Sequence, residues 1–325
     1  MADRAAPRTS PRAAGPLASR ARAPVISIGN LAMGGRGKTP LVAYLAQFLV
    51  DRGERPAIIS RGYKRRRPEA GVVVVSDGHR LCADLDRSGD EPLMLARQIP
   101  GAAVLVCPTR TLAAALAETV MGCTVLLLDD GFQHTAMRRD LDIVLVTAAD
   151  LADRRLPFGR LRSPVSSIGR ADAVILDGVV TSDVSSALLS TGCAPVFTLT
   201  RTLAEARFVE PPSDILDTGV RVVAVAGIAA PERFTQALAR AGWDVARSLP
   251  FADHHRFTQR DVLRMRAAVH ETHAAAVLTT EKDAIRLLPL RPLGVPVAAV
   301  PLRVSVDPAS AFQDWLVTRL ERARA

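Results

Sequence analysis

Residues 24–41 read PVISIGNLAMGGRGKTPL: a short apolar run, a glycine-dense loop and then Lys38-Thr39. The apolar run predicts a strand, and the apolar periodicity that continues to Val50 predicts a helix. Glycines let the intervening loop turn so that successive backbone N–H groups face one concavity, to which the helix adds the positive end of its dipole. The stretch therefore predicts a phosphate-binding loop.

This loop approximates the G-x-x-x-x-G-K-[ST] pattern, with Ala32 where the first glycine belongs. In such a site the lysine reaches the β- and γ-phosphates and the Thr39 hydroxyl ligates Mg²⁺. Only three lysines occur among 42 basic residues, so Lys38 favours a function that needs a compact ammonium over a chance glycine turn. The residues expected to contact ATP are Gly34, Gly35, Arg36, Gly37, Lys38, Thr39 and Pro40.

Composition limits the class of protein. The 325 residues are 48% hydrophobic, enough for one large α/β domain or two lobes. A net charge of +9 implies acidic partners such as nucleic acid, anionic lipid or a phosphorylated substrate. The four cysteines include no C-x-x-C pair, which argues against a zinc site or a disulfide framework. Residues 1–23 hold arginines without an apolar signal core, and we expect a disordered basic arm there.

A second strand end supports the nucleotide-site interpretation. Residues 123–128 are an apolar strand pattern that ends in Asp129 and Asp130. In P-loop proteins a carboxylate at this place holds Mg²⁺ directly or through water. Either acid, together with Thr39, is a candidate metal ligand.

Alternating strand and helix patterns predict the fold class. Expected strands at 57–60, 103–107, 123–128 and 142–147 alternate with helical segments, which is typical of a parallel sheet covered on both faces. We expect an α/β fold of the P-loop NTPase type, with a mostly parallel sheet flanked by helices, over residues 24–165. A second, smaller α/β lobe is expected over residues 166–325, with a C-terminal helix able to pack back on the core.

Two polar segments are candidates for catalysis. Asp90 and Glu91 precede Pro92 at a predicted helix start, where capping explains one carboxylate and leaves the other for a catalytic role. Residues 253–255, Asp-His-His, precede a capping-box-like start at Thr258. Because a carboxylate can fix the tautomer of a nearby imidazole, this turn is a candidate contribution to a site.

Basic residues gather at predicted strand ends. Five of the seven residues 61–67 are basic, which fits a ligand-contacting loop as well as a solvated one. Arg110 begins a predicted helix, where its charge is unfavourable for the dipole. The Pro/Gly/Arg-rich connector from Arg154 includes Arg162, and we interpret it as a linker that also contacts an anion.

Several segments together resemble the tetraacyldisaccharide 4′-kinase family, over nearly everything from Pro24 onward. The combination of the P-loop, DDGFQH and the Asp-His-His turn is specific to that family. The segments that carry the resemblance are SIGNLAMGGRGKTP, SRGYKR, GDEP, PTR, DDGFQH, RADAVIL, GIAAPERF, FADHHRFT and TTEKDA.

The resemblance implies transfer of the γ-phosphate of ATP, with Mg²⁺, to the 4′-hydroxyl of a tetraacylated glucosamine disaccharide 1-phosphate. This acceptor is a lipid A precursor at the cytoplasmic face of the bacterial inner membrane. The resemblance further implies that Asp90 is the general base, His254 its partner and Lys38 the residue that stabilises developing charge. The residues expected to contact the acceptor are Arg61, Arg110, Gln133, His134 and Arg162.

The sequence departs from the family pattern in two places. The family usually has an apolar or amphipathic segment ahead of the P-loop, so either the start of this sequence is truncated or docking relies on charge attraction to an anionic membrane surface. Ser163 stands where the family often has glutamate. We expect no nucleic-acid partner, since few aromatic residues are present for stacking on bases. We also expect a monomer.

The main alternative is a P-loop ATPase switch or a metallochaperone-like protein. The segment MGGRGKT resembles the K-G-G-x-G-K-[ST] loop of such proteins, although Met33 replaces the extra lysine. A switch of this kind would hydrolyse ATP without a sugar acceptor.

Overall fold

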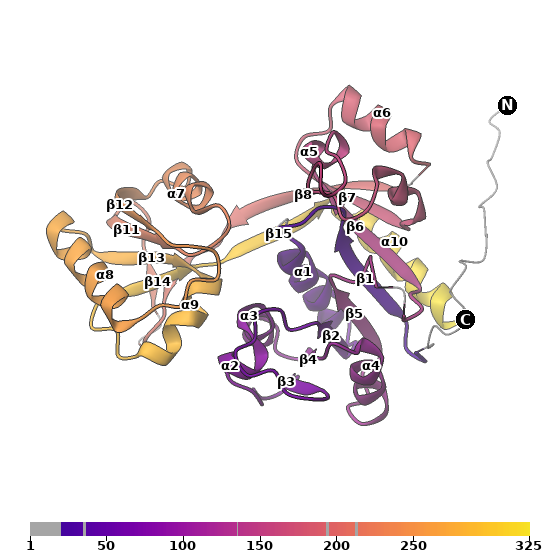
Figure 1. Ribbon diagram of the computed structural model, residues 1–325, viewed down its shortest axis with the longest axis horizontal. Helices are drawn as coiled ribbons and strands as arrows, with labels where there is room; N and C mark the ends of the chain where they lie inside the picture. The colour runs from indigo at the N-terminus through magenta and orange to yellow at the C-terminus, as the bar shows by residue number, and fades with distance from the viewer. Residues whose placement is uncertain (1–20, 35–36, 135, 193–194, 212–213) are drawn as a thin grey trace.

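Two β-sheets, each covered by helices, organise the chain (Figure 1). The computed structural model describes residues 21–34, 37–134, 136–192, 195–211 and 214–325. Most of the expected basic arm, together with Gly35 and Arg36 of the glycine loop, lies outside these ranges.

The first sheet has nine strands in the order β15-β8-β7-β6-β1-β5-β2-β4-β3. The strands are parallel except for β3, which is antiparallel to β4, and β15, which is antiparallel to β8. Its strands are β1 (Val25–Asn30), β2 (Pro56–Ser60), β3 (Val73–Asp77), β4 (Ala103–Val106), β5 (Val125–Asp129), β6 (Leu141–Val146), β7 (Ala173–Asp177), β8 (Val196–Leu203) and β15 (Leu302–Asp307).

Helices cover both faces of this sheet, as its almost wholly apolar central strands require. One face packs against α1, α3 and α10, and the other against α4 and α6. The helices of the first lobe are α1 (Lys38–Asp51), α2 (Leu85–Ser88), α3 (Asp90–Gln98), α4 (Arg110–Thr119), α5 (Ala148–Leu151), α6 (Ser182–Ser190) and α10 (Ala309–Arg324).

The second sheet has six strands in the order β10-β9-β14-β13-β11-β12. Four of them, β14, β13, β11 and β12, run parallel to one another. Helix α8 covers one face and α7 the other. The elements of this lobe are β9 (Ala206–Phe208), β10 (Ile215–Leu216), β11 (Arg221–Ala226), α7 (Pro231–Arg240), β12 (Asp244–Pro250), α8 (Gln259–Thr272), β13 (Ala276–Thr280), α9 (Glu281–Leu287) and β14 (Val297–Val300).

The predicted fold class is confirmed, but the predicted boundary at residue 165 is wrong for the sheets. Strands β7 and β8 extend the first sheet beyond that point, and β15 returns to it after the second lobe is complete. Strand β15 was not predicted, because it follows β14 after a single proline, although its residues alternate between apolar and polar types as in a half-buried strand. The second lobe is therefore inserted between β8 and β15, which extend toward it in Figure 1.

Helix α9 also links the lobes. It belongs to the second lobe by its position after β13, yet Ile285 packs in the core that includes α1, α3 and α10. Leu287, two residues on, packs instead in the core beneath α8. Among the described residues, no helix is both long and apolar enough to cross a membrane.

Candidate active site

The glycine loop ends where α1 begins, at Lys38. Gly37 immediately precedes the helix with a φ of 82°, a left-handed conformation that favours glycine. A β-carbon at this position would lie 2.4 Å from Nη2 of Arg201, so the guanidinium packs directly against the loop. The Lys38 ammonium donates to Oδ1 of Asn30 at 3.0 Å and lies 3.4 Å from Oδ1 of Asp130.

Asp130 forms an ion pair that ties three segments together. It follows the end of β5 with a φ of 55°. Arg162 donates to both carboxylate oxygens, at 2.9 and 2.8 Å, and to Oδ1 of Asn30 at 2.6 Å. Burial alone would raise the pKa of Asp130, but the hydrogen bonds from Arg162 and the charge of Lys38 lower it to about 2. Asp130 is therefore ionised at neutral pH.

Asp129, the last residue of β5, is in a different environment. Its residue exposure is 6%, and its buried Oδ1 has no hydrogen-bond partner in the described part of the chain. Burial, and next the charge of Glu91, raise its pKa to about 7. A buried carboxylate oxygen without a donor suits a cation, because cation binding would supply the missing stabilisation.

The amino terminus of α3 lies beside the amino terminus of α1. Glu91 accepts a hydrogen bond from the Thr39 hydroxyl at 3.4 Å through one carboxylate oxygen. Its other oxygen accepts from the Lys282 ammonium of α9 at 2.8 Å. Glu91 thus connects the nucleotide loop with the second lobe.

Asp90 and His254 meet at this junction. Nδ1 of His254 lies 3.0 Å from Oδ2 of Asp90, and an ionised carboxylate only accepts, so the proton belongs on Nδ1. Arg286 of α9 donates to the same oxygen through Nε at 2.9 Å and also through Nη2, and Lys282 Nζ lies 3.9 Å away. Burial would raise the pKa of Asp90, but His254, Lys282 and Arg286 hold it well below its usual range.

The second lobe fixes this arrangement from behind. Arg286, buried to 7% exposure, donates to the backbone oxygen of Gly227 and to Oδ1 of Asp283, each at 2.7 Å. His254 has a φ of 62°, which turns the chain so that its imidazole faces Asp90. The neighbouring His255 contacts Asp261, at 3.1 Å, in the predicted capping box of α8.

The residues expected to contact an acceptor lie at different depths. Arg61 is exposed, whereas Arg110 is buried and donates to the backbone oxygens of Asp129 and Asp130. Gln133 donates to the backbone oxygen of Asn30 at 2.8 Å. His134 is half-buried, and burial together with Arg110, Arg139 and Arg61 lowers its pKa.

Four residues of the site were not predicted in these contacts: Asn30, Glu91, Lys282 and Arg286. A polar residue at the end of an apolar strand was the available signal for Asn30, and the scarcity of lysine was the signal for Lys282. Arg286 had no such signal, since it is one of many arginines in the sequence. Ser163, where the family often has glutamate, receives a hydrogen bond from Gln133 at 3.3 Å.

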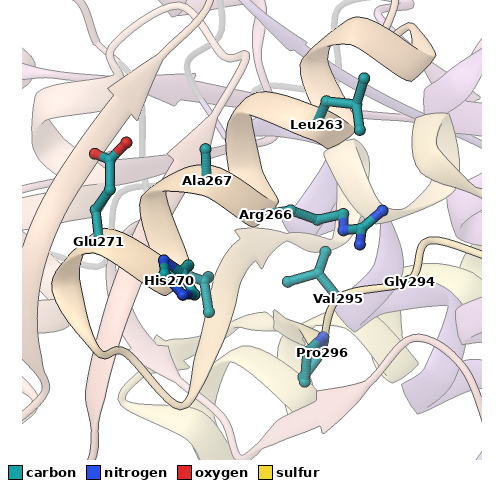
Figure 2. Close-up of a pocket in the computed structure, with 9 residues that line it drawn as sticks. Leu263, Arg266, Ala267, His270, Glu271, Gly294, Val295 and Pro296 are labelled. Carbon is teal, nitrogen blue, oxygen red and sulfur yellow. The ribbon is translucent and has the colours of Figure 1, made fainter.

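A separate hollow in the second lobe does not include these groups. It has a volume of about 610 Å³ and lies between α8 and residues 294–296 (Figure 2). Its lining residues include Arg266, His270 and Glu271, and none of these is among the described partners of Asp90 or Lys38. We therefore assign the candidate active site to the junction of the lobes.

A mostly parallel sheet with helices on both faces, a glycine loop ahead of α1 and an acidic end on β5 define a P-loop NTPase-type protein. A family model described as tetraacyldisaccharide-1-P 4′-kinase matches residues 8–321. The chain belongs to this kinase family.

Individual relatives agree with the family match. Tetraacyldisaccharide 4′-kinase of Anaeromyxobacter sp. (strain Fw109-5) is 42% identical, covering 94% of this chain and 84% of the relative. Its namesake in Syntrophus aciditrophicus (strain SB) is 36% identical, covering 91% and 84%. The crystal structure of the apo form of LpxK from Aquifex aeolicus in complex with ATP superposes with a TM-score of 0.74 at 30% identity, covering 93% of this chain and 90% of that one.

Proposed function

We propose that this protein transfers the γ-phosphate of ATP to the 4′-hydroxyl of tetraacyldisaccharide 1-phosphate in lipid A biosynthesis. The family match and the ATP-bound Aquifex aeolicus relative support this function. The observation that carries the mechanism is the contact between Asp90 and His254 beside the nucleotide loop, at 3.0 Å.

Asp90 is the general base. Its Oδ2 accepts from Arg286 and contacts His254, whereas Oδ1 accepts, among the described residues, only the backbone N–H of Glu91, at 3.1 Å. Oδ1 therefore has capacity left to accept the proton of an acceptor hydroxyl. The lowered pKa makes Asp90 a weak base, which is sufficient because phosphoryl transfer passes through a loose transition state that needs little early deprotonation.

His254 orients Asp90, and Lys38 stabilises charge on the transferring group. With its proton on Nδ1, His254 holds the carboxylate in one direction from the second lobe. Lys38 lies at the start of α1, where the backbone of the glycine loop and the helix dipole also favour phosphate. On ATP binding the lysine would exchange its contacts with Asn30 and Asp130 for phosphate oxygens.

Thr39 and Asp129, which both interact with Glu91, fit Mg²⁺. Thr39 supplies a hydroxyl and Asp129 a buried carboxylate oxygen without a donor, and both are hard oxygen ligands. Within the described residues no group of three or more His, Cys, Asp or Glu side chains is arranged to hold a metal. This agrees with Mg²⁺ sites in which substrate phosphates complete the coordination. When bound there, Mg²⁺ would neutralise charge on the β- and γ-phosphates.

The acceptor approaches on the basic side of the site. Arg61 is exposed, and after burial, which is the largest cause, its charge helps to lower the pKa values of Arg110 and His134. We assign Arg61 to the anionic headgroup of the acceptor. Arg162 and Arg110 brace Asp130 and the β5 end from behind, with Gln133 beside them. We further propose that the protein acts as a monomer at the cytoplasmic face of the inner membrane.

The test is transfer of label from γ-labelled ATP to tetraacyldisaccharide 1-phosphate. We expect label on the lipid, and little ATP turnover until the acceptor is added. Asp90→Ala should lower kcat by about 10²–10⁴-fold, the usual contribution of a general base, with ATP affinity nearly unchanged. Lys38→Ala should lower both kcat and the affinity for ATP. Equal ATP hydrolysis with and without acceptor would instead support the ATPase switch, and an active Asp90→Ala would refute the assignment of the base.

A further inference from the structure

The turn between α5 and the 3-10 helix η1 (Val165–Arg170), residues 154–161, has a defined conformation. Leu156 N–H donates to the backbone oxygen of Leu161 at 3.0 Å, and Leu161 N–H donates to that of Arg154 at 3.0 Å. A β-carbon at Gly159 would lie 2.1 Å from the Arg154 oxygen, so the turn closes too tightly for a side chain there. Asp153 accepts from Nε of Arg160 at 2.9 Å and holds the base of the turn.

This well-formed turn presents apolar side chains to solvent. Phe158 is 84% exposed, the highest value among the large apolar residues of the described chain, and Leu156 is 49% exposed. Met33, 55% exposed, donates its backbone N–H to the oxygen of Arg160 at 2.8 Å, so it adjoins the turn. A single exposed apolar side chain is common on protein surfaces, whereas a group of them on one ordered turn is typical of an interaction site.

Positive charge surrounds the apolar tip. Arg154, Arg155 and Arg160 lie within seven residues, and the first two are exposed and form no side-chain ion pair in the described part of the chain. Aromatic side chains and arginines together are typical of surfaces that sit at the boundary between headgroups and acyl chains of an anionic bilayer. An acidic protein partner would match the charge, whereas an anionic bilayer matches both the charge and the exposed apolar side chains of Phe158 and Leu156.

The turn is close to the candidate active site. Arg162 follows Arg160 by two residues and pairs with Asp130 and Asn30, which also contact Lys38. Met33 precedes the glycine loop directly. We propose that residues 154–160 and Met33 form a docking surface that inserts Phe158 and Leu156 into an anionic phospholipid bilayer. The proposal rests on the proposed function, in which the acceptor is a lipid, and it names the surface that brings the site to it.

The experiment measures co-sedimentation of the full chain with vesicles of phosphatidylcholine, with and without phosphatidylglycerol. Phe158→Ser should lower the partition coefficient on phosphatidylglycerol vesicles about tenfold, as loss of a buried aromatic ring predicts. Arg154→Gln with Arg155→Gln should lower it about fivefold per arginine, with the loss growing smaller as salt is raised.

Matched controls test whether the loss of any exposed apolar side chain, or of any exposed arginine, would reduce vesicle binding equally. Val120→Ser removes an apolar side chain of 74% exposure at the end of α4, ahead of the start of β5, whereas the glycine loop follows the end of its parallel neighbour β1. Arg233→Gln with Arg240→Gln removes two exposed arginines of α7 in the second lobe. Both controls should bind vesicles as the unmodified chain does.

Three outcomes would overturn the proposal. The first is equal vesicle binding by Phe158→Ser and Val120→Ser. The second is that brominated lipids quench the tryptophan fluorescence of Phe158→Trp no more than that of the unmodified chain. The third is a Phe158-dependent dimer by sedimentation velocity without vesicle binding. Phosphorylation of acceptor in detergent micelles is measured in parallel. Failure there with vesicle binding intact would reject the function, whereas normal micellar activity without vesicle binding would reject the docking surface.

Discussion

Burial and neighbouring charge shift the pKa of Asp90 in opposite directions, and the neighbours in the second lobe determine the result. Burial favours the protonated form, and the three cationic or hydrogen-bonding partners favour the carboxylate. Because the partners prevail, Asp90 is ready to accept a proton across the physiological pH range. Arg286 makes two of these hydrogen bonds and is itself fixed by Asp283 and Gly227, so we infer that it positions the base.

Replacement of Arg286 should therefore change the pH profile of the reaction. In Arg286→Met the pKa of Asp90 should rise by about 1 to 3 units, the usual effect of one nearby opposite charge. Activity requires the carboxylate, so the acid limb of kcat/KM should move to higher pH by that amount.

Arg286→Lys should restore part of the shift, because it keeps the charge but not the two-point contact. The control is Arg256→Gln, which breaks another pair between the lobes, with Asp86 at 3.0 Å, and should leave the acid limb in place. An unchanged acid limb in Arg286→Met, in protein that still folds, would contradict the positioning role.

Asp129 should lower the stability of the nucleotide-free protein as pH rises. Its folded pKa of about 7 is above its unfolded value, so it favours the folded state below about pH 4 and loses that contribution as pH rises through 7. Asp129→Asn should therefore raise the free energy of unfolding more at pH 8 than at pH 4, by up to about 4 kcal/mol from about 1.4 kcal/mol per pKa unit.

Denaturant unfolding at both pH values measures this difference, and kcat should fall about 10²–10³-fold through loss of an electrostatic contact. Asp130→Asn is the contrasting variant. The lowered pKa of Asp130 contributes stability above about pH 4 that disappears as pH falls toward 2, so this substitution should destabilise the protein at pH 8. Equal effects of the two substitutions on stability would show that their environments do not differ as described.

At the scale of elements, the junction between the glycine loop and α1 concentrates the constraints on the nucleotide site. Gly37 combines a positive φ with close packing against Arg201, and α1 begins directly after it. The loop can point its N–H groups inward only if that backbone conformation is kept.

Gly37→Ala should lower the free energy of unfolding by about 1 kcal/mol or more through backbone strain and should raise KM for ATP roughly tenfold. Gly53→Ala is a matched control, because Gly53 has a φ of 79° just beyond the other end of α1 and no heavy atom within 4 Å of the added β-carbon. It should lose similar stability but bind ATP normally. A normal KM in Gly37→Ala would exclude this residue from the nucleotide cradle.

For the whole molecule, the position of α9 determines whether the site is assembled. Its Ile285 packs into the core of the first lobe. In the sequence Ile285 lies three residues after Lys282 and immediately before Arg286. When the two lobes pack together, Lys282 is therefore placed at Glu91 and Arg286 at Asp90.

Ile285→Ala should lower both stability, by about 2–4 kcal/mol, and kcat measured well below the melting temperature. Leu316→Ala of α10 removes a buried side chain from the same core away from α9, and it should cost similar stability with kcat nearly unchanged. If the two variants lose kcat equally, packing of α9 has no special role in assembling the site.

Much of the fold was predictable because its signals are local. Apolar runs that end in glycine or acidic residues predicted the parallel strands, and the spacing of Gly37, Lys38 and Thr39 predicted the loop and α1. The segment motifs also predicted the family, which the comparisons confirm. The sheet to which β7, β8 and β15 belong was missed, because pairing partners far apart in the chain leave no trace in a short window of sequence.

The residues of the site follow the same division. Which side chains carry phosphate chemistry was readable from residue type and spacing, since a glycine loop, a lysine and a strand-end carboxylate act through short-range geometry. Their partners depend on how the lobes pack: Asp90 is 164 residues from His254 and 196 from Arg286, and β8, β15 and α9 bring them together. The lowered pKa of Asp90 and the raised pKa of Asp129 arise from burial and neighbouring charge, which exist only once the chain has folded.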